Sequence, residues 1–112
     1  MQLYESIFIV RPSLPDEDTA KVIDKMKAVV EKSGTVLKVE NWGKRKLAYE
    51  VKRERKGTFV YLNFEAKGEI IGDLERSYRL EDSVIKYLTV RMKPAVEGTP
   101  AASEVSEHDR VQ

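Results

Sequence analysis

Six segments with regular apolar spacing follow one another along the chain, and their order restricts the possible folds more than any other feature. The spacing predicts strands over residues 3–10, 36–52, 58–66 and 83–92, a helix over residues 16–33, and a second helix that begins at Gly68. The order strand–helix–strand–strand–helix–strand is the split βαβ pattern. With right-handed crossovers, it predicts an α+β, ferredoxin-like βαββαβ fold, in which a four-stranded antiparallel sheet carries two helices on one face.

Glycines indicate where the chain changes direction. Gly34 is placed to end the first helix as a left-handed cap, because glycine adopts positive φ without a steric penalty. Gly43 indicates a bend within the long second strand. A turn at Arg55-Lys56-Gly57 is expected to join the second and third strands.

The sheet face opposite the helices is expected to expose apolar side chains. If Val60 and its alternate neighbours point to the helices, Phe59 and Tyr61 point away from them, and the same reasoning turns Ile7 and Ile9 away. An apolar patch rimmed by charge usually marks an interface. The alternative is that alternation in central strands is loose, so that the predicted faces are exchanged.

Composition indicates a single soluble domain with a charged surface. The chain has 112 residues, 41% of them hydrophobic and 35% charged, and no cysteine, which excludes disulfides and thiolate chemistry. It has neither a secretory signal pattern nor an apolar run of the ~18 residues that a membrane span needs, so we expect a cytoplasmic protein.

The net charge of +1 conceals an uneven distribution. Residues 1–93 contain 19 Lys and Arg against 15 Asp and Glu, whereas residues 94–112 contain one Arg against four acids. Residues 95–112 are also too polar to offset the entropy cost of ordering. We therefore predict a folded domain over residues 1–94 and a disordered acidic tail over residues 95–112.

Deleting residues 98–112 is accordingly expected to change the free energy of unfolding by only a few tenths of a kcal/mol, as for surface changes elsewhere. Chemical denaturation of the shortened and full chains measures the difference. A loss above about 1 kcal/mol would show that the tail docks on the domain.

Positive charge gathers in one strand and the turn that follows it. Residues 44–56 carry two Glu and seven cations, namely Lys44, Arg45, Lys46, Lys52, Arg53, Arg55 and Lys56. Leu47, Tyr49 and Val51 alternate through the same stretch, as in a half-buried strand. Such a strand suits a polyanion, because cations near phosphates release condensed counterions. The alternative is a solubilising hairpin whose basic residues discourage edge-to-edge pairing.

Catalysis and metal binding have little support in the sequence. The only histidine, His108, lies in the predicted tail, and the six glycines form no phosphate-binding loop. We expect neither an enzyme nor a bound metal or cofactor. Residues 56–64 resemble the RNP1 signature of RNA recognition motifs, but Thr58 stands where the first stacking aromatic belongs, which argues against base stacking.

Three segments resemble the bacterial small-subunit ribosomal protein six family, and the resemblance extends from Met1 to about Pro94. They are Tyr4-Glu5 at the first strand, residues 42–49 (Trp-Gly-Lys-Arg-Lys-Leu-Ala-Tyr), and residues 78–85 (Tyr-Arg-Leu-Glu-Asp-Ser-Val-Ile) before the last strand. Gly34 also matches the family's end of helix one. The Gly-x-basic-x-Leu-Ala-Tyr pattern is the most specific part of the match.

This resemblance implies a cytoplasmic, ribosome-associated protein that binds no small-molecule substrate and no membrane. It implies binding to the central domain of small-subunit ribosomal RNA together with small-subunit ribosomal protein eighteen, during assembly of the platform. The expected RNA contacts are the seven cations above with Arg79, Lys86, Arg91 and Lys93. The expected protein contacts are Ile7, Ile9, Trp42, Tyr49, Phe59 and Tyr61.

The competing hypothesis is a non-ribosomal regulatory module of the same fold, which would use its sheet to bind a small ligand or to dimerise. Salt separates the two hypotheses, because RNA binding weakens steeply with ionic strength and a sheet-mediated dimer does not.

Overall fold

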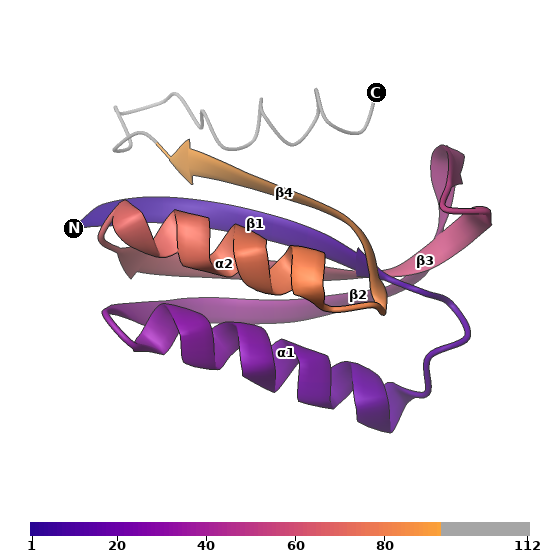
Figure 1. Cartoon of the computed structure of the whole chain (residues 1–112), viewed down its shortest axis with the longest axis horizontal. Helices are drawn as coiled ribbons and strands as arrows, with labels where there is room; N and C mark the ends of the chain where they lie inside the picture. Colours follow the sequence, from indigo (N-terminus) through magenta and orange to yellow (C-terminus); the bar gives the residue numbers. More distant parts are fainter. Residues whose placement is uncertain (93–112) are drawn as a thin grey trace.

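The computed structural model describes residues 1–92 and has the predicted βαββαβ order. The elements are β1 (Gln2–Val10), α1 (Asp16–Glu31), β2 (Gly34–Val51), β3 (Glu54–Ala66), α2 (Glu69–Leu80) and β4 (Val84–Met92). The strands form one antiparallel sheet in the order β2-β3-β1-β4, and both helices cover the same face (Figure 1). The predicted fold class is therefore confirmed. The predicted tail over residues 95–112 lies outside the described residues, so the domain boundary at residue 94 stays a prediction.

The core lies between the helices and one face of the sheet. Val60, Leu62 and Phe64 of β3 are fully buried at alternate positions, and Phe8 and Val10 of β1 are buried beside them. The helices complete the core with Val22, Met26, Val30, Ile70, Leu74 and Tyr78. The predicted assignment of the two faces is therefore confirmed.

A buried group of hydroxyls fixes α2 against the sheet. Ser6 Oγ in β1 lies 2.7 Å from Tyr78 Oη in α2 and 2.9 Å from Thr89 Oγ1 in β4. Burial raises the pKa of Tyr78, which therefore stays a neutral hydrogen-bonding group. Because buried hydroxyls need partners, this network favours a single position of α2 on the sheet.

The predicted turn at residues 55–57 is wrong. The chain reverses at Lys52 and Arg53, whose φ angles are +48° and +68°, and β3 already begins at Glu54. Positive φ at both central residues is typical of a two-residue type I′ hairpin, which usually carries Asn or Gly. Lysine and arginine give no such signal, so the sequence did not indicate this turn. The third strand begins at Glu54 and not at residue 58 as predicted, which makes the hairpin longer. Gly57 instead lies within β3, where a Cβ would come within 2.3 Å of Ile9 Cγ2.

Gly34 is not the left-handed helix cap that we predicted. Among the described glycines only Gly43 has a positive φ, and α1 ends with Lys32 in the right-handed helical region. Gly34 instead begins β2, where a Cβ would lie 2.3 Å from the carbonyl oxygen of Glu65 in β3. The position needs glycine because the two backbones approach closely.

The predicted bend at Gly43 is a β-bulge. Gly43 has φ +81°, and the pairing with β3 passes from Asn41 opposite Val60 to Gly43 opposite Phe59, which leaves Trp42 without a partner of its own. Bulges strengthen the local twist and re-aim side chains. This bulge places Trp42 and Arg45, three residues apart, on the same face of the sheet.

Candidate nucleic-acid and protein interface

No helix of the described residues covers the second face of the sheet, which we call the open face (Figure 1). The cross-strand register places Ile7 beside Tyr61 and Leu88, and Phe59 beside Ile9. Ile7, Phe59 and Tyr61 are partly exposed, as predicted for a contact surface. Ile9 is only 6% exposed, because the backbone of Gly57 approaches it, so Ile9 supports this face from beneath.

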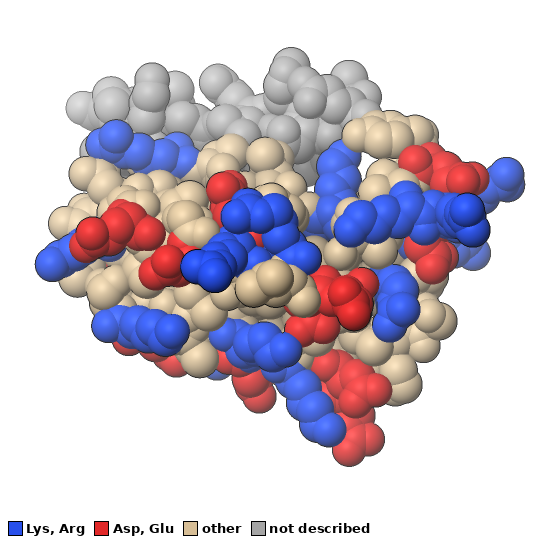
Figure 2. All heavy atoms as spheres, in the orientation of Figure 1, with Lys and Arg blue, Asp and Glu red and all other residues tan. Residues whose placement is uncertain are grey.

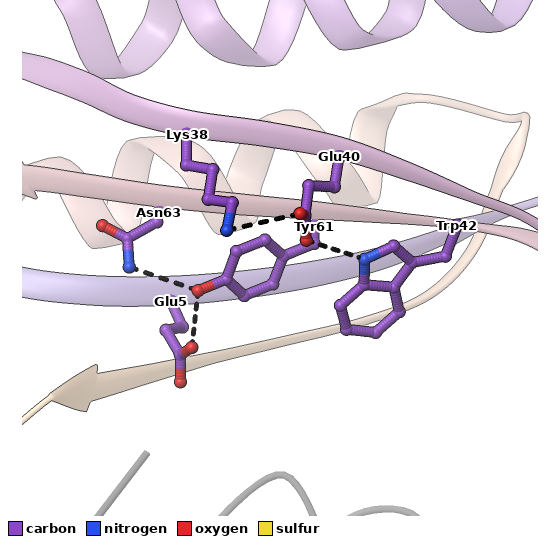
Figure 3. Close-up of polar contacts among 6 residues, drawn as sticks. All are labelled: Glu5, Lys38, Glu40, Trp42, Tyr61 and Asn63. Carbon is purple, nitrogen blue, oxygen red and sulfur yellow. Dashed lines mark hydrogen bonds and ion pairs between the residues drawn. The ribbon is translucent and has the colours of Figure 1, made fainter. Parts of the chain in front are cut away.

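Tyr61 lies at the centre of a polar and aromatic cluster on the open face (Figure 3). Its ring stacks on Trp42, with centroids 5.3 Å apart and planes at 10°. Its hydroxyl donates to Glu5 Oε2 at 2.6 Å and accepts from Asn63 Nδ2 at 3.2 Å. Burial and the hydrogen bond to Glu5 raise the pKa of Tyr61 to about 12, so the hydroxyl is neutral and acts as a donor.

The second half of this cluster holds Trp42 in place (Figure 3). Trp42 Nε1 donates to Glu40 Oε1 at 3.0 Å, and Lys38 Nζ lies 3.3 Å from Glu40 Oε2. The hydrogen bond from Trp42 lowers the pKa of the Glu40 carboxyl, which stays ionised. The sequence indicated Trp42 and Tyr61 as contact residues but not the polar partners that hold them. Strand alternation places Asn63 on the same face as Tyr61, but no sequence signal pairs Glu40 with Trp42.

The outer part of the β2–β3 hairpin curls over one end of the open face. We call residues 44–57 the arm. Between the arm and the sheet runs a groove lined by Ile7, Ile9, Trp42, Arg45, Lys46, Leu47, Ala48, Tyr49, Val51, Phe59, Lys86, Tyr87 and Leu88. Lys86 Nζ of β4 donates to the Tyr49 hydroxyl at 2.7 Å and lies 4.7 Å from the centre of its ring, so this pair connects the arm to β4. Tyr49 is still 57% exposed, unlike the half-buried strand residue that we expected.

All seven predicted cations of the arm are exposed. Figure 2 shows Lys and Arg at the end of the molecule that carries the hairpin, and others over the helices. Within residues 1–92, the only salt bridge made by these seven residues joins Arg55 to Glu50, at 3.8 Å. Exposed salt bridges of this kind contribute little to the stability of the fold. The arm therefore presents most of its positive charge to solvent.

The cations divide between the two faces of the arm. Arg45 stands opposite Gly57 in the register, while Lys44 and Lys46 stand opposite Thr58 and Lys56. The guanidinium carbon of Arg45 lies 5.3 Å from the centre of the Trp42 ring, which places Arg45 on the open face. In this register Arg45 alternates with its two lysine neighbours.

The remaining predicted cations do not form one group. Lys86 stands opposite Ile9, near the arm, whereas Arg91 stands opposite Tyr4 at the other end of β1. Arg79, in the last turn of α2, donates from Nη1 to the Tyr87 hydroxyl at 3.4 Å. Lys93 lies outside the described residues. The structure therefore brings Arg79 and Lys86 toward the arm and separates Arg91 from it.

The described residues contain no group of three or more His, Cys, Asp or Glu side chains that could hold a metal ion. Neither helix among them combines the length and hydropathy of a membrane-spanning segment.

A ferredoxin-like sheet with an uncovered aromatic face and a basic arm defines an interaction module built to contact other macromolecules. The family model described as "Ribosomal protein S6" matches residues 3–91. The chain therefore belongs to the ribosomal protein S6 family. It is a structural, non-enzymatic constituent of the small ribosomal subunit and is ribosome-associated in the cytoplasm.

Individual relatives agree with this assignment. The chain is 45% identical over 92 residues to "Small ribosomal subunit protein bS6" of Nostoc sp., with 81% of this chain and 85% of that protein covered. It is 36% identical over 108 residues to the protein of the same name from Desulfatibacillum aliphaticivorans, with 96% of this chain but 58% of that protein covered.

Two solved structures share this fold, and the first of them is named as a ribosomal protein S6. The crystal structure of 30S ribosomal protein S6 from Thermotoga maritima superposes with a TM-score of 0.78 at 29% identity, covering 99% of this chain and 98% of that one. An uncharacterized protein from the same organism shares the fold, with a TM-score of 0.53 at 16% identity and coverage of 82% and 98%.

Proposed function

We propose that this protein binds the central domain of small-subunit ribosomal RNA together with small-subunit ribosomal protein eighteen during assembly of the platform. The observation that carries the proposal is the position of the arm. It places a set of exposed cations directly beside an uncovered aromatic and apolar face. One end of the molecule thus offers a surface for phosphates and a surface for a protein next to each other.

The RNA contact is supported by the charge of the arm. Exposed cations that are not paired with carboxylates attract phosphates and release counterions, whatever the base sequence. Arginine suits paired hydrogen bonds to phosphate, and lysine gives a more diffuse attraction. Base readout has little support, because the Trp42 ring already has Tyr61 stacked on it and Arg45 within 5.3 Å. We therefore expect recognition of the shape and backbone of a folded RNA junction.

The protein contact is supported by the open face. Trp42, Phe59 and Tyr61 are partly exposed there, and Leu88 is 41% exposed. Aromatic side chains dominate the energetics of protein interfaces, above all where their polar ends are satisfied. The hydrogen bonds of Trp42 to Glu40 and of Tyr61 to Glu5 provide this and hold both rings in one orientation.

The direct test measures the affinity of the chain for the central-domain RNA fragment, with and without protein eighteen, at several salt concentrations. We expect the chain to bind the RNA fragment only when protein eighteen is present, and we expect this affinity to fall steeply as salt rises. Binding to neither partner would contradict the proposal. A salt-insensitive self-association would instead favour the regulatory module.

Changing Lys44, Arg45 and Lys46 together to glutamine should weaken RNA binding across sequences and leave the fold intact, because all three are exposed. Each lost phosphate contact flattens the plot of log affinity against log salt by roughly 0.7–0.9 units. Since Arg45 lies on the other face of the strand, we expect a total change of about one or two units.

The matched control removes three charges from α1 and the residue that follows it, by changing Lys21, Lys27 and Lys32 to glutamine. The control should retain the wild-type slope. An unchanged slope in the arm variant would move the RNA contact to the cations near β4, namely Arg79, Lys86, Arg91 and Lys93.

A further inference from the structure

Three cations that lie far apart in the sequence line one hollow at the edge of the sheet. Lys52 comes from the turn of the arm, Arg79 from the end of α2 and Lys86 from the start of β4. The rest of the lining is formed by Tyr78, Val84, Ile85 and Tyr87. The hairpin turn, where Lys52 has φ +48°, thus brings Lys52 to the same hollow as the other two cations.

This hollow has positive charge and no compensating acid. No carboxylate lines it, and none of its three cations takes part in a salt bridge within residues 1–92. Of the acids near these cations in sequence, Glu54 and Asp82 do not line the hollow, and two others are paired with other cations. Glu50 pairs with Arg55, and Glu81 pairs with Lys25 at 2.6 Å. Cations that line the same hollow together attract an anion.

Two of the three cations are held in place by tyrosine hydroxyls. Lys86 donates to Tyr49 at 2.7 Å, and Arg79 donates to Tyr87 at 3.4 Å. Tyr87 lines the hollow. Because its hydroxyl accepts a hydrogen bond from Arg79, the hydroxyl proton remains available for donation to a bound acceptor. The Tyr87 ring stacks on Tyr78, with centroids 5.1 Å apart, and Tyr78 is buried. This side of the hollow is therefore packed against the core.

We propose that this hollow binds one backbone phosphate of the RNA, a site that rests on the proposed function. A phosphate suits the donors present, which are a guanidinium, two ammonium groups and a hydroxyl that can be shared among its acceptor oxygens. The hollow is open at the surface, so a continuous chain can pass over it. Because Lys52 belongs to the arm, the bound phosphate would also fix the arm against α2 and β4.

The test changes Lys52, Arg79 and Lys86 together to glutamine, all three being exposed, and measures RNA affinity over a salt series. If the three cations share one phosphate, the slope should fall by about one contact, roughly 0.7–0.9 units, and not by three. The dissociation constant should rise about tenfold or more at low salt, as expected for charge-assisted hydrogen bonds. Changing Lys21, Lys27 and Lys32 to glutamine is the control with equal charge.

RNAs with single neutral methylphosphonates identify the contact itself. The wild-type protein should lose affinity at one backbone position, and the triple variant should be indifferent to that same substitution. Two results would contradict this phosphate site. One is a triple variant with the RNA affinity and the salt slope of the wild type, and the other is a slope change of two units or more. Tyr49→Phe, which removes only the hydroxyl beside Lys86, should give a smaller rise in the dissociation constant and leave the slope unchanged.

Failure of this site and failure of the proposed function are distinguishable. If the wild-type protein binds no ribosomal RNA, the proposed function fails, and the hollow is no RNA contact. Titration with inorganic phosphate then shows whether it is a free-phosphate site. If the NMR amide chemical shifts around Lys52, Arg79 and Lys86 change saturably with phosphate, and do not change in the triple variant, the hollow is a free-phosphate site. If they do not change in the wild-type protein, the hollow is not an anion site.

Discussion

Replacing Gly34 with alanine is expected to lower the free energy of unfolding by about 2–3 kcal/mol, the upper range for overpacking a close contact. The added Cβ would lie 2.3 Å from the carbonyl oxygen of Glu65 and 2.7 Å from the Cβ of Ala66. Because the nearest obstacle is backbone, no side-chain rotation relieves the contact, and β2 must move away from β3. Chemical denaturation of the variant and the wild type measures the loss.

Gly72 provides the matched control for this substitution. It lies in α2, and a Cβ there meets nothing within 4 Å. Gly72→Ala should therefore stabilise the protein by about 0.5–1 kcal/mol, because alanine is the better helix former. If Gly34→Ala is as stable as the wild type, the close approach of β2 and β3 is not what requires glycine.

Tyr61→Ala is expected to weaken binding to protein eighteen by about 2 kcal/mol or more, roughly thirtyfold, as for a central aromatic of an interface. Its effect on stability should be smaller, about 1 kcal/mol, because the lost contacts are the stack on Trp42 and the bond to Glu5 at a partly exposed site. Thermal unfolding and titration calorimetry with the partner separate the two effects.

Two further variants give this experiment its controls. Leu62→Ala, at the next position and fully buried, should lose about 2–5 kcal/mol of stability without removing a partner contact. Tyr61→Phe removes only the hydroxyl and isolates the bond to Glu5. If Tyr61→Ala unfolds readily while its affinity holds, the open face is not the surface that meets the partner.

The sequence by itself determined the architecture and the character of its surfaces. A period of two along β3 separates Val60, Leu62 and Phe64 from Phe59 and Tyr61, because successive side chains of a strand point to opposite faces. The same local rule assigned the open face, and simple counting located the cations of the arm. Residues 42–49 resembled one protein family, and comparison with known proteins confirmed that family.

Tertiary structure alone decided how these parts meet. The bulge at Trp42 and the turn at Lys52 and Arg53 each depend on how β2 pairs with β3, which apolar spacing does not encode. Gly34 has its role because of Glu65, which is distant in sequence.

The hollow at the edge of the sheet is the clearest case. Lys52, Arg79 and Lys86 are separate surface charges in the sequence, and they come together only because the arm curls toward α2 and β4. Local patterns report which side of a strand is buried, whereas convergence of distant residues depends on strand register and twist.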